Sequence, residues 1–181
     1  MSSTSRGAER RTDDFYATPA WCVEALLPKL RPFASVLDPS AGRGAILDAV
    51  REWESGAATC GFELDRRRAG ECAGAGHYVY CADALAVPWP CTDVIVMNPP
   101  FSFLMEFIEE ALGQKHNETE VACLLRLGFL AGQKRRDFWR ANPADMWVLS
   151  RRPSFTGKGT DSADYCWAVW GTGTRGRWGV L

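Results

Sequence analysis

The sequence predicts an α/β protein built on a doubly wound, mostly parallel sheet of seven strands, and three observations indicate this fold. Short apolar runs alternate with helical segments, which is typical of parallel strands joined by right-handed crossovers. The run Val94 to Met97 is apolar at every position, as expected for a strand covered on both faces. The last two predicted strands are joined by a loop without helical periodicity, so we expect an antiparallel C-terminal pair.

Length and composition are those of an ordinary globular protein. A chain of 181 residues fits one domain with its own core, so we expect residues 15–181 to form a single domain. Residues 1–14 are rich in Ser, Arg, Glu and Asp, which predicts a disordered leader. The sequence has no stretch of about 18 apolar residues, so we expect no membrane span.

The charge and cysteine patterns exclude several classes of protein. A formal net charge of −1 excludes a uniformly basic nucleic-acid binder, so any polyanion contact must come from local clusters. The candidate clusters are Arg66-Arg67-Arg68, Lys134-Arg135-Arg136, and Arg151-Arg152 with Lys158. The seven cysteines form no C-x-x-C pair and the two histidines lack ligand spacing. We therefore expect reduced thiols, a cytoplasmic setting and no metal site.

The first half of the chain is interpreted as a helix followed by three strands with intervening helices. Thr18 as N-cap and Pro19 as first helical residue predict a helix that ends near Pro28. Ser35 to Asp38 is the first strand, and the glycines after it precede a helix over 45–53. The next expected elements are a strand over 58–63, a short Arg-rich helix to about 73, and a strand over 77–81.

The second half contains the remaining strands. Pro99 and Pro100 fix φ and remove two N–H donors, so the strand Val94 to Met97 must end at Asn98. An amphipathic helix follows, with its apolar side formed by Phe103, Leu104, Phe107, Ile108 and Leu112. The last expected elements are a strand over 121–127, a helix over 133–141, and strands over 146–149 and 165–170.

The turn after the first strand reads Asp38-Pro39-Ser40-Ala41-Gly42-Arg43-Gly44. Its glycines let a backbone approach a ligand closely, and the following helix N-terminus favours anionic groups. Leu47 stands where a dinucleotide fingerprint would have its third glycine. The acidic Asp38 would repel a pyrophosphate but suits a ligand ammonium, such as the methionine end of S-adenosylmethionine. A tight turn without a ligand is the open alternative.

Two further acids stand at predicted strand ends. Glu63 ends the second strand, 19 residues beyond Gly44, where an acid can accept hydrogen bonds from a ribose diol. Asp83 follows the third strand, where it could meet the exocyclic amine of an adenine. Each acid alone could be a surface carboxylate, but together with Asp38 they mark the carboxyl ends of three successive strands.

Asn98-Pro99-Pro100-Phe101 closes the fourth strand, at the sheet edge where open α/β sheets bind their ligands. A side-chain carbonyl, the backbone carbonyls of the turn and a stacking ring suit a planar substrate that carries an NH2 group. A plain proline turn after a hydrophobic strand is the alternative interpretation.

With these motifs in this order, the chain resembles the S-adenosylmethionine-dependent amino-methyltransferases of N6-adenine type. The glycine-rich turn is similar to their cofactor motif, and Asn98-Pro99-Pro100-Phe101 is similar to their catalytic tetrapeptide. Phe15-Tyr16-Ala17-Thr18-Pro19 resembles the segment that closes over the methionine moiety, and its place upstream matches the gamma-type order. The resemblance covers about residues 15–171 and implies a Rossmann-like class I methyltransferase fold.

The resemblance also implies roles for individual residues. Catalysis would fall to Asn98, Pro99, Pro100 and Phe101. Cofactor contacts would come from Tyr16, Thr18, Pro19, Asp38, Pro39, Ser40, Ala41, Gly42, Gly44, Glu63, Leu64, Asp83, Ala84 and Asn98. Substrate contacts would come from Phe101, Arg151, Arg152, Phe155 and Lys158, the last four in the loop that ends at Asp164.

The expected substrate is DNA, with the adenine flipped out of the stack. The chain has no room for the separate target-recognition domain of larger family members, so selectivity would come from loops or from a partner subunit or dimer. Three alternatives stay open: N6-adenine methylation of RNA, N5-glutamine methylation of a protein, and a non-catalytic cofactor-binding subunit.

Overall fold

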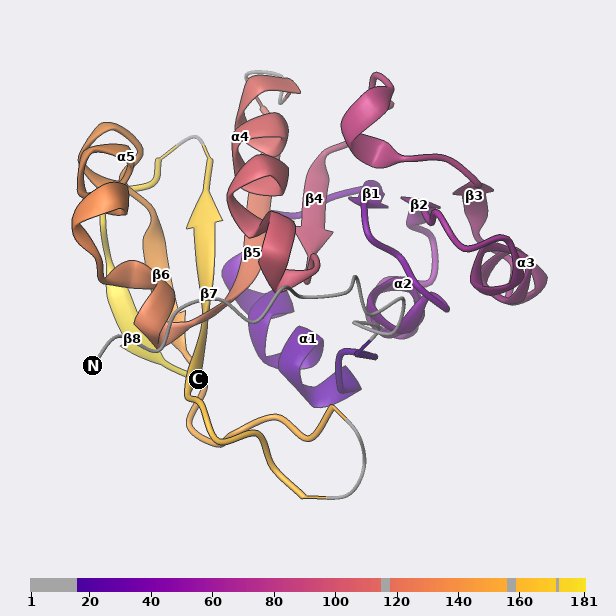
Figure 1. Ribbon diagram of the computed structural model, residues 1–181. Coiled ribbons are helices and arrows are strands. Elements are labelled where there is room, and N and C mark those ends of the chain that lie inside the picture. The colour runs from indigo at the N-terminus through magenta and orange to yellow at the C-terminus, as the bar shows by residue number, and fades with distance from the viewer. Residues whose placement is uncertain (1–15, 115–117, 156–158, 172) are drawn as a thin grey trace, which may run out of the picture.

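The computed structural model describes residues 16–114, 118–155, 159–171 and 173–181 (Figure 1). The predicted leader over 1–14 and the predicted substrate residue Lys158 lie outside the described residues. The described chain forms one mixed sheet with helices on both faces, in the order β3-β2-β1-β4-β5-β7-β6-β8. This arrangement confirms the predicted doubly wound α/β fold with its antiparallel C-terminal strands.

The first five strands, which run parallel to one another, follow the apolar runs closely. They are β1 (Ser35–Asp38), β2 (Ala58–Phe62), β3 (Tyr78–Tyr80), β4 (Val94–Met97) and β5 (Glu120–Arg126). The helices between them are α1 (Ala20–Leu26), α2 (Ala45–Trp53), α3 (Arg66–Gly74) and α4 (Leu104–Gln114). Short 3-10 turns join them at η1 (Leu27–Lys29), η2 (Ala84–Ala86) and η3 (Phe101–Phe103).

The C-terminal part completes the sheet. After β5 come η4 (Leu127–Leu130), η5 (Gln133–Arg135), α5 (Arg136–Ala141), β6 (Asp145–Val148), β7 (Tyr165–Trp170) and β8 (Trp178–Val180). The strand β7 runs antiparallel to both β5 and β6, with Cys123 opposite Ala168 and Trp147 opposite Trp167. The helix predicted over 133–141 is divided into a 3-10 turn and a short α-helix.

The sheet is buried on both faces because side chains alternate along each strand. In β4, Val94 and Val96 pack with α1 and α2, whereas Ile95 and Met97 pack with α4 on the other face. All four residues are buried, as the unbroken apolar run predicted. In the described ranges no helix is both long and apolar enough to cross a bilayer.

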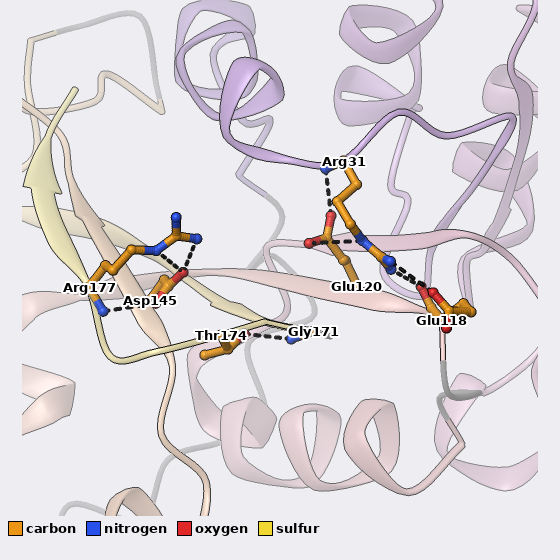
Figure 2. Close-up of polar contacts among 7 residues, drawn as sticks. All are labelled: Arg31, Glu118, Glu120, Asp145, Gly171, Thr174 and Arg177. Atoms are coloured by element: carbon orange, nitrogen blue, oxygen red, sulfur yellow. Dashed lines mark hydrogen bonds and ion pairs between the residues drawn. The ribbon is translucent and has the colours of Figure 1, made fainter.

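The prediction of seven strands is wrong by one, since β8 pairs in parallel with β6 and makes eight. This strand has only three residues, and its Trp178 and Val180 are exposed, so no apolar pattern marks it. Polar contacts position it. The buried carboxylate of Asp145 accepts hydrogen bonds from the Arg177 backbone N–H (2.8 Å) and guanidinium (2.6 and 2.9 Å), as Figure 2 shows.

A second polar contact ties the segment after α1 to the start of β5. Arg31 donates its backbone N–H to the buried Glu120 (2.8 Å), and its side chain pairs with Glu118 (2.9 Å; Figure 2). Gly171 leaves room for Glu120, because a Cβ there would lie 2.7 Å from the glutamate Cγ. These contacts lie near the amino ends of β5 and β6 and leave the opposite edge for the cavity described below.

Candidate functional site

A cavity of about 780 Å³ opens at the carboxyl ends of β1, β2, β3 and β4. Twelve of its lining residues were predicted from the sequence as site residues: Tyr16, Thr18, Asp38, Pro39, Ser40, Ala41, Glu63, Leu64, Asp83, Ala84, Asn98 and Pro100. Parallel strands end at one edge of a sheet, so residues distant in sequence meet there. The cavity therefore brings together residues of the glycine-rich turn, the two acidic strand ends and the Asn98 turn.

The glycine-rich turn forms one wall of the cavity. Gly42 (φ 57°) and Gly44 (φ 93°) both adopt left-handed backbone conformations, which glycine alone adopts without strain. A Cβ at Gly44 would also meet the Cys72 sulfur at 2.9 Å. The Ala41 N–H donates to the Phe62 carbonyl (2.9 Å), which holds the turn against the end of β2. Gly42 and Gly44 shape the turn but do not line the cavity.

Asp38 is the buried acid at the start of this turn. Its Oδ1 accepts hydrogen bonds from the Ser40 backbone N–H (2.9 Å) and the Ser40 hydroxyl (3.1 Å). Burial, aided by the nearby charge of Glu63, raises the pKa of Asp38 to about 7 despite those hydrogen bonds. A cation that reaches the cavity would favour the ionised form of this carboxyl group.

Glu63 and Asp83 line the cavity at the ends of β2 and β3. The Oε1 atom of Glu63 accepts from the Asp65 N–H (2.7 Å) and from Arg68 (3.1 Å). Asp83 caps η2 by accepting from the Leu85 N–H (3.0 Å). In each carboxylate one oxygen positions the side chain.

Asn98 lies at the end of β4 and is held by a residue 80 positions earlier. Its Nδ2 donates to the Thr18 hydroxyl at 3.0 Å. The interpretation of Thr18 as a helix N-cap is therefore wrong, because α1 begins at Ala20, Pro19 occupies the cap position, and no side chain caps it. The upstream segment instead holds the Asn98 carboxamide beside the cavity that both residues line.

The chain has the class I S-adenosylmethionine-dependent methyltransferase fold. Comparison with solved structures shows this fold in a protein from Listeria monocytogenes that is provisionally assigned to those enzymes (15% identity, TM-score 0.65, 90% of this chain). A predicted O-methyltransferase from Agrobacterium tumefaciens aligns over 90% of this chain and 84% of its own, with 18% identity and a TM-score of 0.61. The plantazolicin methyltransferase BpumL, solved with SAH, aligns over 84% and 81%, with 12% identity and a TM-score of 0.55.

These likenesses are structural only. Comparison of the sequence with protein-family models and with curated proteins gives no match. The chain spans 62% of the length of the Listeria protein.

Phe101 of this methyltransferase fold does not line the cavity, and one face of its ring is covered. The Arg126 guanidinium lies 4.2 Å from the ring centroid. Arg126 is held there by Tyr165 (2.9 Å) and Asp161 (3.2 Å). Burial raises the pKa of Tyr165 to about 12, so its hydroxyl stays protonated and donates to Asp161 (2.8 Å). This cluster covers one face of Phe101 in the predicted tetrapeptide, and sequence reasoning missed it because its members come from β5, β7 and a loop.

The predicted substrate residues Arg151, Arg152 and Phe155 do not line the cavity either. Arg152 pairs with Asp164 at 2.7 Å, and Arg151 lies 4.2 Å over the Trp21 ring. Phe155 packs edge-on against Tyr165 (5.2 Å between ring centroids) and Tyr16 (6.1 Å). The aromatic chain Tyr16–Phe155–Tyr165 therefore connects the loop to the upstream segment beside the cavity.

Two more predicted residues have supporting places. Pro19 and Pro99 lie outside the cavity lining, and Pro99 is buried beneath the turn that presents Asn98.

Sequence reasoning missed Gly61, where a Cβ would lie 2.6 Å from the Ala41 Cβ and 3.0 Å from the Asp38 carbonyl oxygen. It also missed the apolar lining that Ile46, Leu85, Phe103 and Phe107 add to the cavity. The sequence had placed Phe103 and Phe107 only on the apolar side of an amphipathic helix.

Proposed function

We propose that this protein transfers a methyl group from S-adenosylmethionine to the N6 amino group of adenine in DNA. The observation that carries the proposal is the Asn98 carboxamide, which shares one cavity with Asp38, Glu63 and Asp83. A carboxamide oxygen recognises a planar NH2 group, and the three acids suit the polar groups of a nucleoside joined to an amino acid.

The lining residues fit this cofactor. Asp38 would hold the ammonium of the methionine part, and the Glu63 carboxylate would accept from the ribose diol. Asp83 would accept from the adenine amine, and the exposed Leu64 with Phe107 would cover the faces of the ring. When bound, the cofactor supplies a methyl group on a positively charged sulfur.

The chain's own contribution to the reaction is orientation. The N6 lone pair of adenine is delocalised into its ring and is a poor nucleophile. Hydrogen bonds from N6–H to the Asn98 oxygen and the Pro99 carbonyl would favour a pyramidal nitrogen that points toward the cofactor. Thr18 keeps the Asn98 amide in the required orientation. Fixed hydrogen-bond acceptors of this kind lower a barrier without a strong base.

The target base must leave the helical stack to reach this cavity. Stacking on Phe101 would hold the base, and base–aromatic stacking contributes about 1–3 kcal/mol. Because Arg126 covers one face of the ring, its guanidinium must move away if the base stacks on that face. Substrate entry would then break the contacts of Arg126 with Tyr165 and Asp161.

The experiment that tests the function is methylation with labelled S-adenosylmethionine. DNA, RNA and protein would be offered separately, and digested nucleosides would be analysed by mass spectrometry. We expect N6-methyladenine in DNA. Label only in RNA would move the activity to RNA, label in a glutamine side chain would move it to protein, and S-adenosylmethionine binding without transfer would indicate a non-catalytic subunit.

A further inference from the structure

The guanidinium of Arg126 lies at the carboxyl edge of the sheet, against the turn that follows Asn98. Strand β5 runs parallel to β4, with Cys123 opposite Met97. Arg126 is the last residue of β5, three positions beyond Cys123, and Phe101 stands four positions beyond Met97. The Arg126 side chain therefore reaches the same edge of the sheet at which the proposed target base would be held.

Three contacts hold this guanidinium in one place. Its central carbon lies 4.2 Å from the centroid of the Phe101 ring. Its Nε donates to the Tyr165 hydroxyl (2.9 Å), and its Nη2 donates to Asp161 (3.2 Å). A planar group with a ring on one side and acceptors at two of its nitrogens has its orientation fixed before any ligand arrives.

The same contacts leave part of the guanidinium open to solvent. The Arg126 side chain is 45% exposed, although Phe101, Tyr165 and Asp161 all touch it. At 4.2 Å the guanidinium carbon is almost in van der Waals contact with the ring, so no third planar group fits between the two. A ligand can therefore reach this guanidinium only from the side that faces away from Phe101.

The charge of Arg126 is already balanced, which decides between a phosphate and a nucleobase as ligand. Asp161 accepts from Arg126, from the Tyr165 hydroxyl (2.8 Å) and from the Ala163 N–H (3.0 Å), so its carboxylate is firmly placed. A phosphate would have to compete with this carboxylate for the guanidinium. A nucleobase needs only the uncovered side of the plane, because guanidinium groups stack on aromatic faces.

The location of Arg126 distinguishes it from other arginines that lie over aromatic rings. Arg151 lies 4.2 Å over Trp21, and Arg135 lies 4.4 Å over Phe129. Of these three arginines, Arg126 alone rests on a ring of the predicted catalytic tetrapeptide. It is therefore the one that a substrate entering beside Asn98 would meet.

We propose that a nucleobase of the substrate strand stacks on the side of the Arg126 guanidinium that faces away from Phe101. The inference rests on the proposed function, since it names a contact of that substrate. Phe101, Arg126 and the base would form one stack, and Arg126 would keep its bonds to Tyr165 and Asp161. A plane that is held in advance loses little conformational freedom when the base binds. The base is the target adenine or its immediate neighbour on the strand.

The test uses Arg126→Lys, which keeps a positive charge beside Asp161 and removes the plane. Arg51→Lys is the matched control, because Arg51 also pairs with a carboxylate (Asp48, 3.0 Å) and is 36% exposed, but lies in the last turn of α2. The probe is a fluorescent single-stranded DNA 12-mer with one central adenine, and fluorescence anisotropy gives Kd at several salt concentrations. Thermal unfolding checks that each variant is folded.

We expect Arg126→Lys to bind the 12-mer at least about fivefold more weakly, which is the lower end of the range for losing one stacked base. The slope of log Kd against log salt should stay the same, because the charge is kept. Arg51→Lys should match the wild type.

Abasic probes identify the stacked base. Three further 12-mers each lack one base, either the central adenine or one of its two neighbours. The wild type and Arg126→Lys should bind equally to the probe that lacks the stacked base, because the side chain then has nothing to stack on. With the other two probes the difference between the proteins should remain.

Four outcomes would overturn the proposal: equal binding of the intact 12-mer by the wild type and Arg126→Lys, an equal loss in Arg51→Lys, a loss of one size with all three abasic probes, or tighter binding by Arg126→Ala than by the wild type. The last would show that Arg126 blocks the base site. A wild type that methylates adenine in DNA keeps the proposed function in each of these cases. Binding through Arg126 without methyl transfer would instead refute the function and keep the contact.

Discussion

We expect ionisation of Asp38 to make the affinity for the proposed cofactor depend on pH, and the size of the effect follows from the burial of this side chain. The side chain is 2% exposed and its pKa is raised to about 7. If only the ionised form pairs with the ligand ammonium, the binding-competent fraction is about 0.03 at pH 5.5 and about 0.5 at pH 7. Affinity for S-adenosylhomocysteine should therefore rise about fifteenfold over this interval.

The same group should affect the free protein with the opposite sign. The folded pKa of Asp38 lies above the value of 3.8 expected for the unfolded chain, so the folded state binds the proton more tightly. Stability contributed by this proton is present below about pH 4 and is lost as the pH rises toward 7, by up to about 4 kcal/mol. Asp38→Asn should remove that decline and also weaken cofactor binding.

Calorimetric titrations at pH 5.5, 6.0, 6.5 and 7.0 measure the first effect, and urea unfolding at the same pH values measures the second. The ligand amine has a pKa of about 7.7–8.0, so it stays charged throughout. Asp38→Asn is the control and should show weak, pH-independent binding. A wild-type affinity that is flat between pH 5.5 and 7, or a variant that keeps the wild-type profile, would refute the reasoning.

Three further predictions concern the same cavity. Asn98→Ala should lower the rate constant of single-turnover methylation about 10²–10³-fold while leaving the cofactor affinity measured by calorimetry within about twofold. A normal rate would show that Asn98 does not orient the amine. Asn142→Ala, at the end of α5, is the matched control. Thr18→Val should lower kcat about tenfold because it frees the Asn98 amide, and Thr18→Ser should restore the rate. A Thr18→Val variant that changed only KM would show that Thr18 does not orient Asn98. Gly61→Ala should destabilise the fold by about 1–3 kcal/mol and weaken cofactor binding, because the added Cβ would meet Ala41 and the Asp38 carbonyl oxygen. Gly70→Ala in α3 is the control, since its Cβ would meet nothing within 4 Å. In urea unfolding this control should stabilise the fold by up to about 1 kcal/mol.

The order of the elements was predictable because it depends on local pattern. Apolar runs such as Val94 to Met97 and glycines such as Gly42 and Gly44 carry their structural consequence in a few neighbouring residues. The strand β8 escaped prediction, since Arg177 bound to the buried Asp145 positions it rather than any apolar periodicity. The contact between residues 145 and 177 cannot be inferred from either segment alone.

By itself the sequence determined the α/β architecture, the strand ends that carry Asp38, Glu63, Asp83 and Asn98, and the kind of chemistry to which those groups are suited. Only the tertiary structure decided which of these side chains are free of other contacts and which are held by partners distant in the sequence. It gave Thr18 a hydrogen bond to Asn98 in place of a helix cap, placed Arg126 over Phe101, and paired Arg152 with Asp164. The physical reason is that backbone pattern is local, whereas a polar side chain bonds to whichever partner folding brings within about 3 Å.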